Sequence, residues 1–109
     1  MSAFYQVVYT DPACRDLDGI YSYIAFVLLS PSSAKRIVGS IRDAISSLSY
    51  MPERFAVADG LLWGAEPLRR MMVERYSVYY AVFKESLRVV IAGITHKGRR
   101  FGAEKKASA

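Results

Sequence analysis

The sequence predicts an α+β domain in which an antiparallel helical hairpin packs on a mainly antiparallel four-stranded sheet, in the order βααβββ. Three observations predict this fold. Two consecutive stretches in the first half carry hydrophobic residues at helical spacing. The second half is rich in aromatic and β-branched residues, which favour strands. One further β-type segment precedes the helices, so the sheet should take strands from both ends of the chain.

The first half of the chain predicts one strand and two helices. Residues 4–10, FYQVVYT, are mostly aromatic or β-branched and predict a strand. Asp11 is expected to be the N-cap of the first helix, with Pro12 as the first helical residue. A break at Ser30-Pro31 separates the two helices, and Pro52 ends the second one. The side chains expected to pack on the sheet as one core are Leu17, Ile20, Ile24, Ile37, Ile41, Ile45 and Leu48.

The second half predicts three strands after an irregular segment. Residues 53–66 contain glycine turn signals and are expected to form no regular structure. A tight turn is predicted at Arg75-Tyr76 and a short hairpin link at residues 84–86. With the helices on one face of the sheet, the other face is left for solvent or for a partner. The predicted strands are residues 68–75, 76–83 and 87–95.

Length and composition limit the class of protein. The chain has 109 residues, which is enough for one domain with one modest core. Hydrophobic residues make up 52%, which argues against disorder over most of the chain. No apolar run is long enough for a membrane helix, and the N-terminus lacks the features of a signal peptide, so a cytoplasmic protein is expected. The single cysteine, Cys14, and the single histidine, His96, argue against an internal disulfide and a transition-metal site.

The positive charge is concentrated at the C-terminal end. The chain has 15 Lys and Arg against 10 Asp and Glu, a net charge of +5. From Lys97 onward there are five basic residues and one acidic residue, so this short end carries +4 of that charge. Residues 102–109 are expected to be a disordered basic tail. The residues directly after the last strand, Lys97, Arg99 and Arg100, are either part of that tail or a site for a polyanion.

Basic residues also alternate with tyrosines on the predicted strands. The chain has no phosphate-binding loop, no HExxH and no CxxC motif. Arginine can bind phosphate through two hydrogen bonds, and tyrosine can stack on a nucleotide base. The other interpretation is that the arginines are solvated edge charges and the tyrosines are core residues. The core interpretation is favoured for Tyr80 and Val82, whereas both stay open for Arg70, Arg75 and His96.

Several motifs, in chain order, resemble the RelE/ParE superfamily of bacterial toxins. The segment DLDGIYSYIA resembles the DL..I..YI signature of that family. SAKRIVGSIRDAISSLSYMPER resembles its A..+...I..AI..L...P.R segment. LRRMMVERYSVYYAVFKESLRVVIAGITHKGRR resembles its LR.M.V..Y.V.Y.V.....V.I..I.H.RR segment. The resemblance covers about residues 4–101, which implies a single toxin domain over residues 1–101.

The resemblance implies the toxin of a type II toxin–antitoxin module, which a cognate antitoxin neutralises. RelE-like members bind the ribosome and cleave mRNA with neither a metal nor another cofactor. That reaction needs a base for the 2′ proton, a cation for the phosphorane and an acid for the leaving oxygen. ParE-like members inhibit DNA gyrase and are not enzymes. Ribosome-dependent mRNA cleavage is the favoured hypothesis from the sequence, gyrase inhibition is the alternative, and the assembly is a homodimer or a toxin–antitoxin hetero-oligomer.

The resemblance also implies functional residues. For mRNA cleavage, Glu66 is the expected base, Arg70 the cation and His96 the acid, since histidine titrates near neutral pH. Ser77 stands where many cleaving members have arginine, and this difference favours gyrase inhibition or a toxin-like domain with weakened or lost activity. Residues expected to contact RNA or another partner are Arg69, Arg75, Tyr79, Lys97, Arg99 and Arg100. Residues expected to contact the antitoxin are Tyr23, Phe26 and Trp63.

Overall fold

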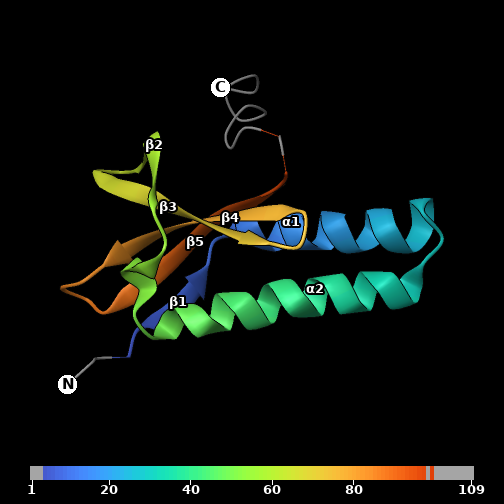
Figure 1. Cartoon of the computed structure of the whole chain (residues 1–109), viewed down its shortest axis with the longest axis horizontal. Coiled ribbons are helices and arrows are strands. Elements are labelled where there is room, and N and C mark those ends of the chain that lie inside the picture. Colours follow the sequence, from blue (N-terminus) through green and yellow to red (C-terminus); the bar gives the residue numbers. More distant parts are fainter. Residues whose placement is uncertain (1–3, 98, 100–109) are drawn as a thin grey trace.

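The predicted α+β architecture is confirmed in a computed structural model that describes residues 4–97 and 99 (Figure 1). The expected basic tail and Arg100 lie outside these described residues. Two long helices run side by side in opposite directions next to a twisted sheet (Figure 1). The elements are β1 Gln6–Tyr9, α1 Asp11–Ser22, the π-helix η1 Tyr23–Val27, α2 Pro31–Ser46, the 3-10 helices η2 Ser47–Ser49 and η3 Pro52–Arg54, β2 Val57–Trp63, β3 Glu66–Val73, β4 Tyr76–Phe83 and β5 Arg88–His96.

The sheet has five strands in the order β1-β5-β4-β3-β2, so the expected count of four was wrong by one. β1 is parallel to β5, and the other pairs are antiparallel. The additional strand is β2, in the segment that we expected to be irregular. Its pairing with β3 shifts register between Val57 and Leu62, and Gly60 has a φ of 75°. The glycine signals therefore mark an irregularity within a strand and, at Gly64, the turn that follows it.

α1 begins one residue earlier than expected. Its N-cap is Thr10, whose Oγ1 accepts a hydrogen bond of 3.2 Å from the Ala13 N–H. The same hydroxyl donates to the Ile91 carbonyl at 2.7 Å, so this cap also joins the helix to β5. Threonine, like aspartate, can fill this position, because each offers an oxygen to a free N–H of the first turn. Asp11 instead lies in the first turn, where its negative charge favours the helix dipole.

The tip of the helical hairpin has its own small core. After α1 the chain forms the π-helix η1, in which the Leu28 N–H donates to the Tyr23 carbonyl at 3.0 Å. Ile24, Ala25 and Ala34 are buried there in a cluster that contains no sheet residue. The expectation that Ile24 belongs to the core on the sheet was therefore wrong, because this part of the hairpin packs on itself.

The main core lies between the hairpin and one face of the sheet. Four of the predicted core residues are at most 1% exposed, namely Leu17, Ile41, Ile45 and Leu48. The sheet side of the same cluster is formed by Met71, Val78, Tyr80, Val82, Val89, Ile91 and Ile94. The core interpretation of Tyr80 and Val82 is therefore confirmed. Ile20 and Ile37 are half-buried and pack against this core and against the tip cluster.

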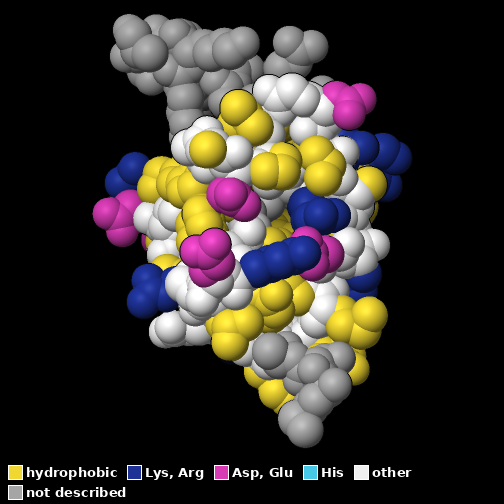
Figure 2. Space-filling model, turned by 90° about the vertical axis from the view of Figure 1, so that its left-hand side faces the viewer, with side chains coloured by type: hydrophobic (Ala, Val, Ile, Leu, Met, Phe, Trp, Pro, Cys, Tyr) yellow, Lys and Arg dark blue, Asp and Glu magenta, His cyan; other side chains and the backbone are white. Residues whose placement is uncertain are grey.

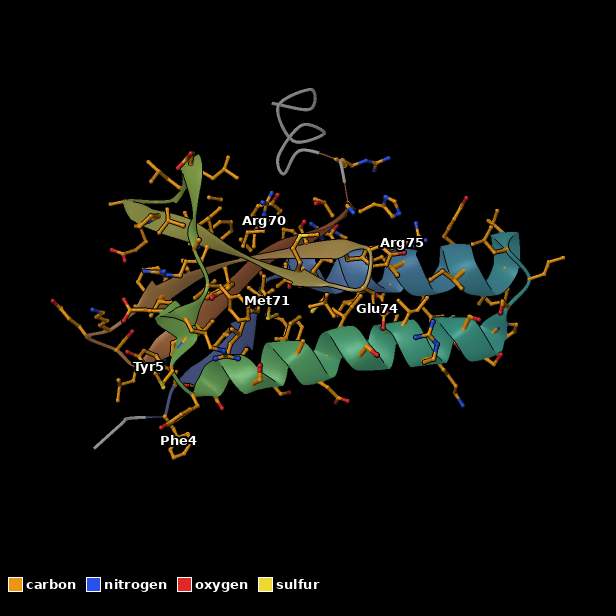
Figure 3. The ribbon with its side chains drawn as sticks, viewed as in Figure 1. Phe4, Tyr5, Arg70, Met71, Glu74 and Arg75 are labelled. Atoms are coloured by element: carbon orange, nitrogen blue, oxygen red, sulfur yellow. The ribbon has the colours of Figure 1, made fainter. Side chains whose placement is uncertain are left out.

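The second face of the sheet is partly covered by its own strands. Leu68, Tyr79, Ala81 and Ala92 are buried on this face. Side chains from β2, including Trp63, pack against them. Arg70 projects from β3 on the side opposite Met71, which points toward α2 (Figure 3). The second face is therefore a small apolar cluster with charged side chains around it.

Candidate functional site

The three residues expected to cleave RNA lie in different places. Glu66 and Val73 are the two ends of β3, and seven residues of strand span roughly 23 Å. Val73 pairs with Tyr76, and Tyr76 pairs with His96, so Glu66 and His96 lie toward opposite ends of the sheet. Side chains also alternate between faces along a strand. Glu66 and Arg70 share the face of buried Leu68, whereas His96 follows Tyr76 on the helix side.

Ser77 is buried on the second face of the sheet. It is 4% exposed, and its hydroxyl donates to the sulfur of Met72 at 3.0 Å. Its neighbour on β5 is Thr95. The place where many cleaving members carry an arginine is therefore occupied here by a buried, uncharged group.

The turn between β3 and β4 lies at Glu74-Arg75, one residue earlier than expected. Glu74 adopts a φ of 56°, and its carboxylate accepts a hydrogen bond of 3.3 Å from the guanidinium of Arg36 on α2. Figure 3 shows Glu74 and Arg75 together at this turn, beside the helical hairpin. The turn removes Arg75 from the strand, so this side chain is not placed to replace the missing arginine at position 77.

A groove of about 1150 Å³ lies between the helical hairpin, the β3–β4 turn and the end of β5. We call it the hairpin–turn groove. His96, the last residue of β5, lines it together with Lys97 and Arg99, so two members of the basic segment after β5 belong to this groove. The other charged lining residues are Arg15, Asp16, Arg36, Glu74 and Arg75. The apolar and aromatic lining residues are Ile20, Tyr23, Ile24, Leu28, Ile37, Tyr76 and Ile94.

Aromatic and titratable side chains meet in this groove. The rings of His96 and Tyr76 are packed edge to face, and their centroids are 5.4 Å apart. Burial, followed by the neighbouring Tyr23, raises the pKa of Tyr76 above its ordinary value. Tyr76 therefore keeps its proton near neutral pH and is not a base there. The residues of this groove that the sequence did not suggest are Arg15, Asp16, Arg36 and Tyr76, which come from separate elements.

The remaining predicted partner residues have different surroundings. Arg69 donates to the carbonyls of Glu53 and Phe55 at 3.2 and 2.6 Å, so it fastens the loop before β2. Tyr79 is 4% exposed and lies in the second-face cluster, where its ring is not available for stacking on a base.

Figure 2 shows the end of the molecule at the left of Figure 1, where acidic side chains stand among the basic ones.

The expected antitoxin residues do not form one surface. Tyr23 and Phe26 are 54% and 71% exposed at the hairpin tip. Trp63 is half-buried in the second-face cluster on β2. The exposure of the first two agrees with a role in binding a partner, because exposed apolar groups often mark such surfaces. Trp63 lies elsewhere and has a packing role.

Two further properties concern only the described part of the chain. No group of His, Cys, Asp and Glu side chains within residues 4–97 and 99 is arranged to hold a metal ion. None of the described helices has the length and hydrophobicity needed to cross a membrane.

Sequence comparison identifies the family. The sequence model of the ParE toxin of the parDE type II toxin–antitoxin system matches residues 7–101. The chain belongs to the ParE toxin family. This ParE-family toxin is thus the toxin component of a type II toxin–antitoxin system. A search of curated proteins gave no significant match.

Solved structures show the same fold. The ParE-family toxin is similar to a chain from the chromosomal ParDE toxin–antitoxin system of P. aeruginosa, with a TM-score of 0.70 and 23% identity over 86% of this chain and 97% of the other. It is also similar to a chain of the RelBE2 complex of Mycobacterium tuberculosis, with a TM-score of 0.58 and 24% identity over 89% and 95%. A third is the archaeal RelE–RelB complex of Pyrococcus horikoshii, with a TM-score of 0.55 and 23% identity over 89% and 99%.

Proposed function

We propose that this toxin arrests growth as a ParE-like inhibitor of DNA gyrase in the cytoplasm and does not cleave mRNA. The observation that carries the proposal is the match of the ParE toxin family over residues 7–101. This reverses the preference drawn from the sequence alone, which favoured cleavage. A cognate antitoxin neutralises the toxin, as the toxin–antitoxin systems of the structural relatives suggest.

The arrangement of the expected catalytic residues supports this proposal, because these residues do not lie together. Phosphoryl transfer without a metal needs a base, an acid and a cation around one phosphate. Here Glu66 and His96 are far apart along the sheet, and they lie on opposite faces. Ser77 offers a buried hydroxyl in place of a guanidinium. The surface is therefore better suited to binding a protein than to cleaving RNA.

The purified toxin is expected to inhibit the ATP-dependent supercoiling of a relaxed plasmid by purified gyrase. The inhibition should increase with toxin concentration and be reversed by the antitoxin encoded beside the toxin gene. Relaxation of the same plasmid by topoisomerase I is the control, because a chain with a pI near 9.5 also binds DNA through its charge alone. Full supercoiling at a large excess of toxin, or equal inhibition of both enzymes, would argue against the proposal.

A further inference from the structure

We propose that the loop end of the helical hairpin binds the surface of an anionic lipid bilayer. We call this end, residues 26–29, the apolar tip. Figure 1 shows the connection between α1 and α2 at the end of the hairpin farthest from β2. The lipid contact goes beyond the proposed function, because it involves neither gyrase nor the antitoxin. It is suggested by the exposure, the backbone, the shape and the charge of this part of the chain.

The apolar tip exposes four consecutive large hydrophobic side chains. Phe26, Val27, Leu28 and Leu29 are 71%, 63%, 55% and 80% exposed. Single apolar residues are normal at a protein surface, whereas a contiguous patch of more than a few hundred Å² marks a contact with a protein or a membrane. Of these four residues, only Leu28 lines the hairpin–turn groove. The tip is therefore a surface distinct from that groove.

The backbone of Leu29 does not favour a leucine. Leu29 directly follows the C-cap of η1 and has a φ of 55°. Glycine usually takes this left-handed position after a helix, because a Cβ atom is unfavourable there. The side chain is also largely outside the core of the protein, at 80% exposure. Neither backbone preference nor internal packing accounts for a leucine at this position, whereas a contact outside the chain does.

The backbone of the turn is suited to a surroundings without water. The Leu28 N–H donates to the Tyr23 carbonyl, and the Ser30 N–H donates to the Ile24 carbonyl, each at 3.0 Å. Lipid offers no hydrogen-bond partner to a peptide group, so backbone groups that enter it must be bonded within the protein. These two N–H groups on either side of Leu29 meet that condition.

The shape of the tip favours lipid over a protein surface. Successive residues of a helix point roughly 100° apart, so the side chains of Phe26, Val27 and Leu28 diverge around the end of the hairpin. A groove on a protein covers one side of such an end, whereas headgroups and acyl chains surround it. Binding in the interface requires apolar side chains to enter by about 5–10 Å and requires no membrane-spanning helix.

The charge around the tip is complementary to an anionic surface. Residues 19–41 include Lys35 and Arg36 and contain no Asp or Glu. Arg36 pairs with Glu74, whereas exposed Lys35 takes part in none of the ion pairs found among the described residues. Lys35 lies four residues after the start of α2, or roughly 6 Å along the helix, which is within the Debye length of about 8 Å. Its charge therefore attracts anionic headgroups when the tip is inserted.

Cosedimentation of the purified full-length toxin with lipid vesicles tests the proposal. We expect the wild type to bind vesicles of equal parts phosphatidylglycerol and phosphatidylcholine, and to bind phosphatidylcholine alone roughly fivefold or more weakly. Phe26→Ser and Leu29→Ser should each lower the partition coefficient about tenfold on the mixed vesicles. Lys35→Glu should lower it about tenfold on the mixed vesicles and leave binding to phosphatidylcholine unchanged.

Two matched variants control for general effects of exposed apolar groups and of charge. Leu62→Ser removes a leucine that is 61% exposed on β2, at the opposite end of the molecule from the tip (Figure 1). Arg88→Glu makes the same charge change as Lys35→Glu on an exposed residue at the start of β5. Both should partition within about twofold of the wild type. Thermal melting of each variant establishes that it is folded.

The controls matter because the basic residues from Lys97 onward also attract anionic vesicles. The proposal is overturned if the wild type does not sediment with the mixed vesicles, or if both serine variants of the tip bind them like the wild type. It is also overturned if these variants keep their vesicle binding and lose gyrase inhibition or self-association, because the tip would then contact a protein. A wild type that binds vesicles and fails to inhibit gyrase would refute the proposed target and support the lipid contact.

Discussion

Ile41→Ala is expected to lower the free energy of unfolding by about 2–5 kcal/mol. Ile41 lies in α2, is 0% exposed and belongs to the main core between the hairpin and the sheet. Removing its larger side chain loses the transfer free energy of the buried methyl and methylene groups. It also leaves a cavity, because helices held against a sheet by many contacts move inward only in part.

Urea unfolding of the wild type and the variant measures this difference. Lys35→Ala is the matched control, since Lys35 is exposed on the same helix and its loss should change stability by less than about 0.5 kcal/mol. A loss below about 1 kcal/mol for Ile41→Ala would contradict the central place of this residue in the core.

The second large effect is a loss of stability at high pH that depends on Tyr80. Its side chain is fully buried, and its hydroxyl donates to the Pro52 carbonyl at 2.6 Å. Burial, only partly offset by Arg69 and Arg54, raises the pKa of Tyr80 from 10.0 to about 12. The unfolded chain therefore loses this proton at lower pH than the folded chain. Stability from the neutral phenol is complete below pH 10 and is lost as the pH rises toward 12, by roughly 2–3 kcal/mol.

Tyr80→Phe separates this effect from other alkaline changes. Burial also raises the pKa values of Tyr9 and Tyr76, and these residues are present in both proteins. The variant should be less stable near neutral pH by about 1–3 kcal/mol, because the buried Pro52 carbonyl loses its donor. Between pH 10 and 12 it should lose less stability than the wild type in chemical unfolding. Equal losses in the two proteins would show that Tyr80 is not the group responsible.

The hydrophobic pattern predicted the fold because the side chains that recur at helical spacing are the ones that are buried. The spacing of Leu17, Ile41 and Ile45 identifies the faces that pack on the sheet, and all three are buried. β2 was missed because glycine usually indicates a turn. Here Gly60 adopts a positive φ, as in turns, but lies within a strand. Ile24 was assigned to the wrong cluster because periodicity identifies a buried face without saying what covers it.

The candidate site was less predictable because it depends on register and long-range contacts. The distance between Glu66 and His96 follows from which residues pair across β3, β4 and β5. A shift by one residue in any pair would reverse the faces of their side chains. Arg15 and Arg36 lie on helix surfaces for which the sequence pattern indicates only a polar character. They border the groove because the turn at Glu74-Arg75 lies beside them in the folded chain. Of the groove residues, the sequence itself suggested Tyr23, Arg75, His96 and the basic segment after β5.

Primer extension on a message translated with purified ribosomes tests the central claim most directly. The claim is that Glu66, Arg70 and His96 do not form a catalytic site. The wild-type toxin is therefore expected to leave the message uncut at concentrations that inhibit gyrase, and His96→Ala should inhibit gyrase as well as the wild type does. The contradicting result is cleavage that requires ribosomes and falls by about 10²–10⁴ in rate with His96→Ala, the loss typical of a missing general acid.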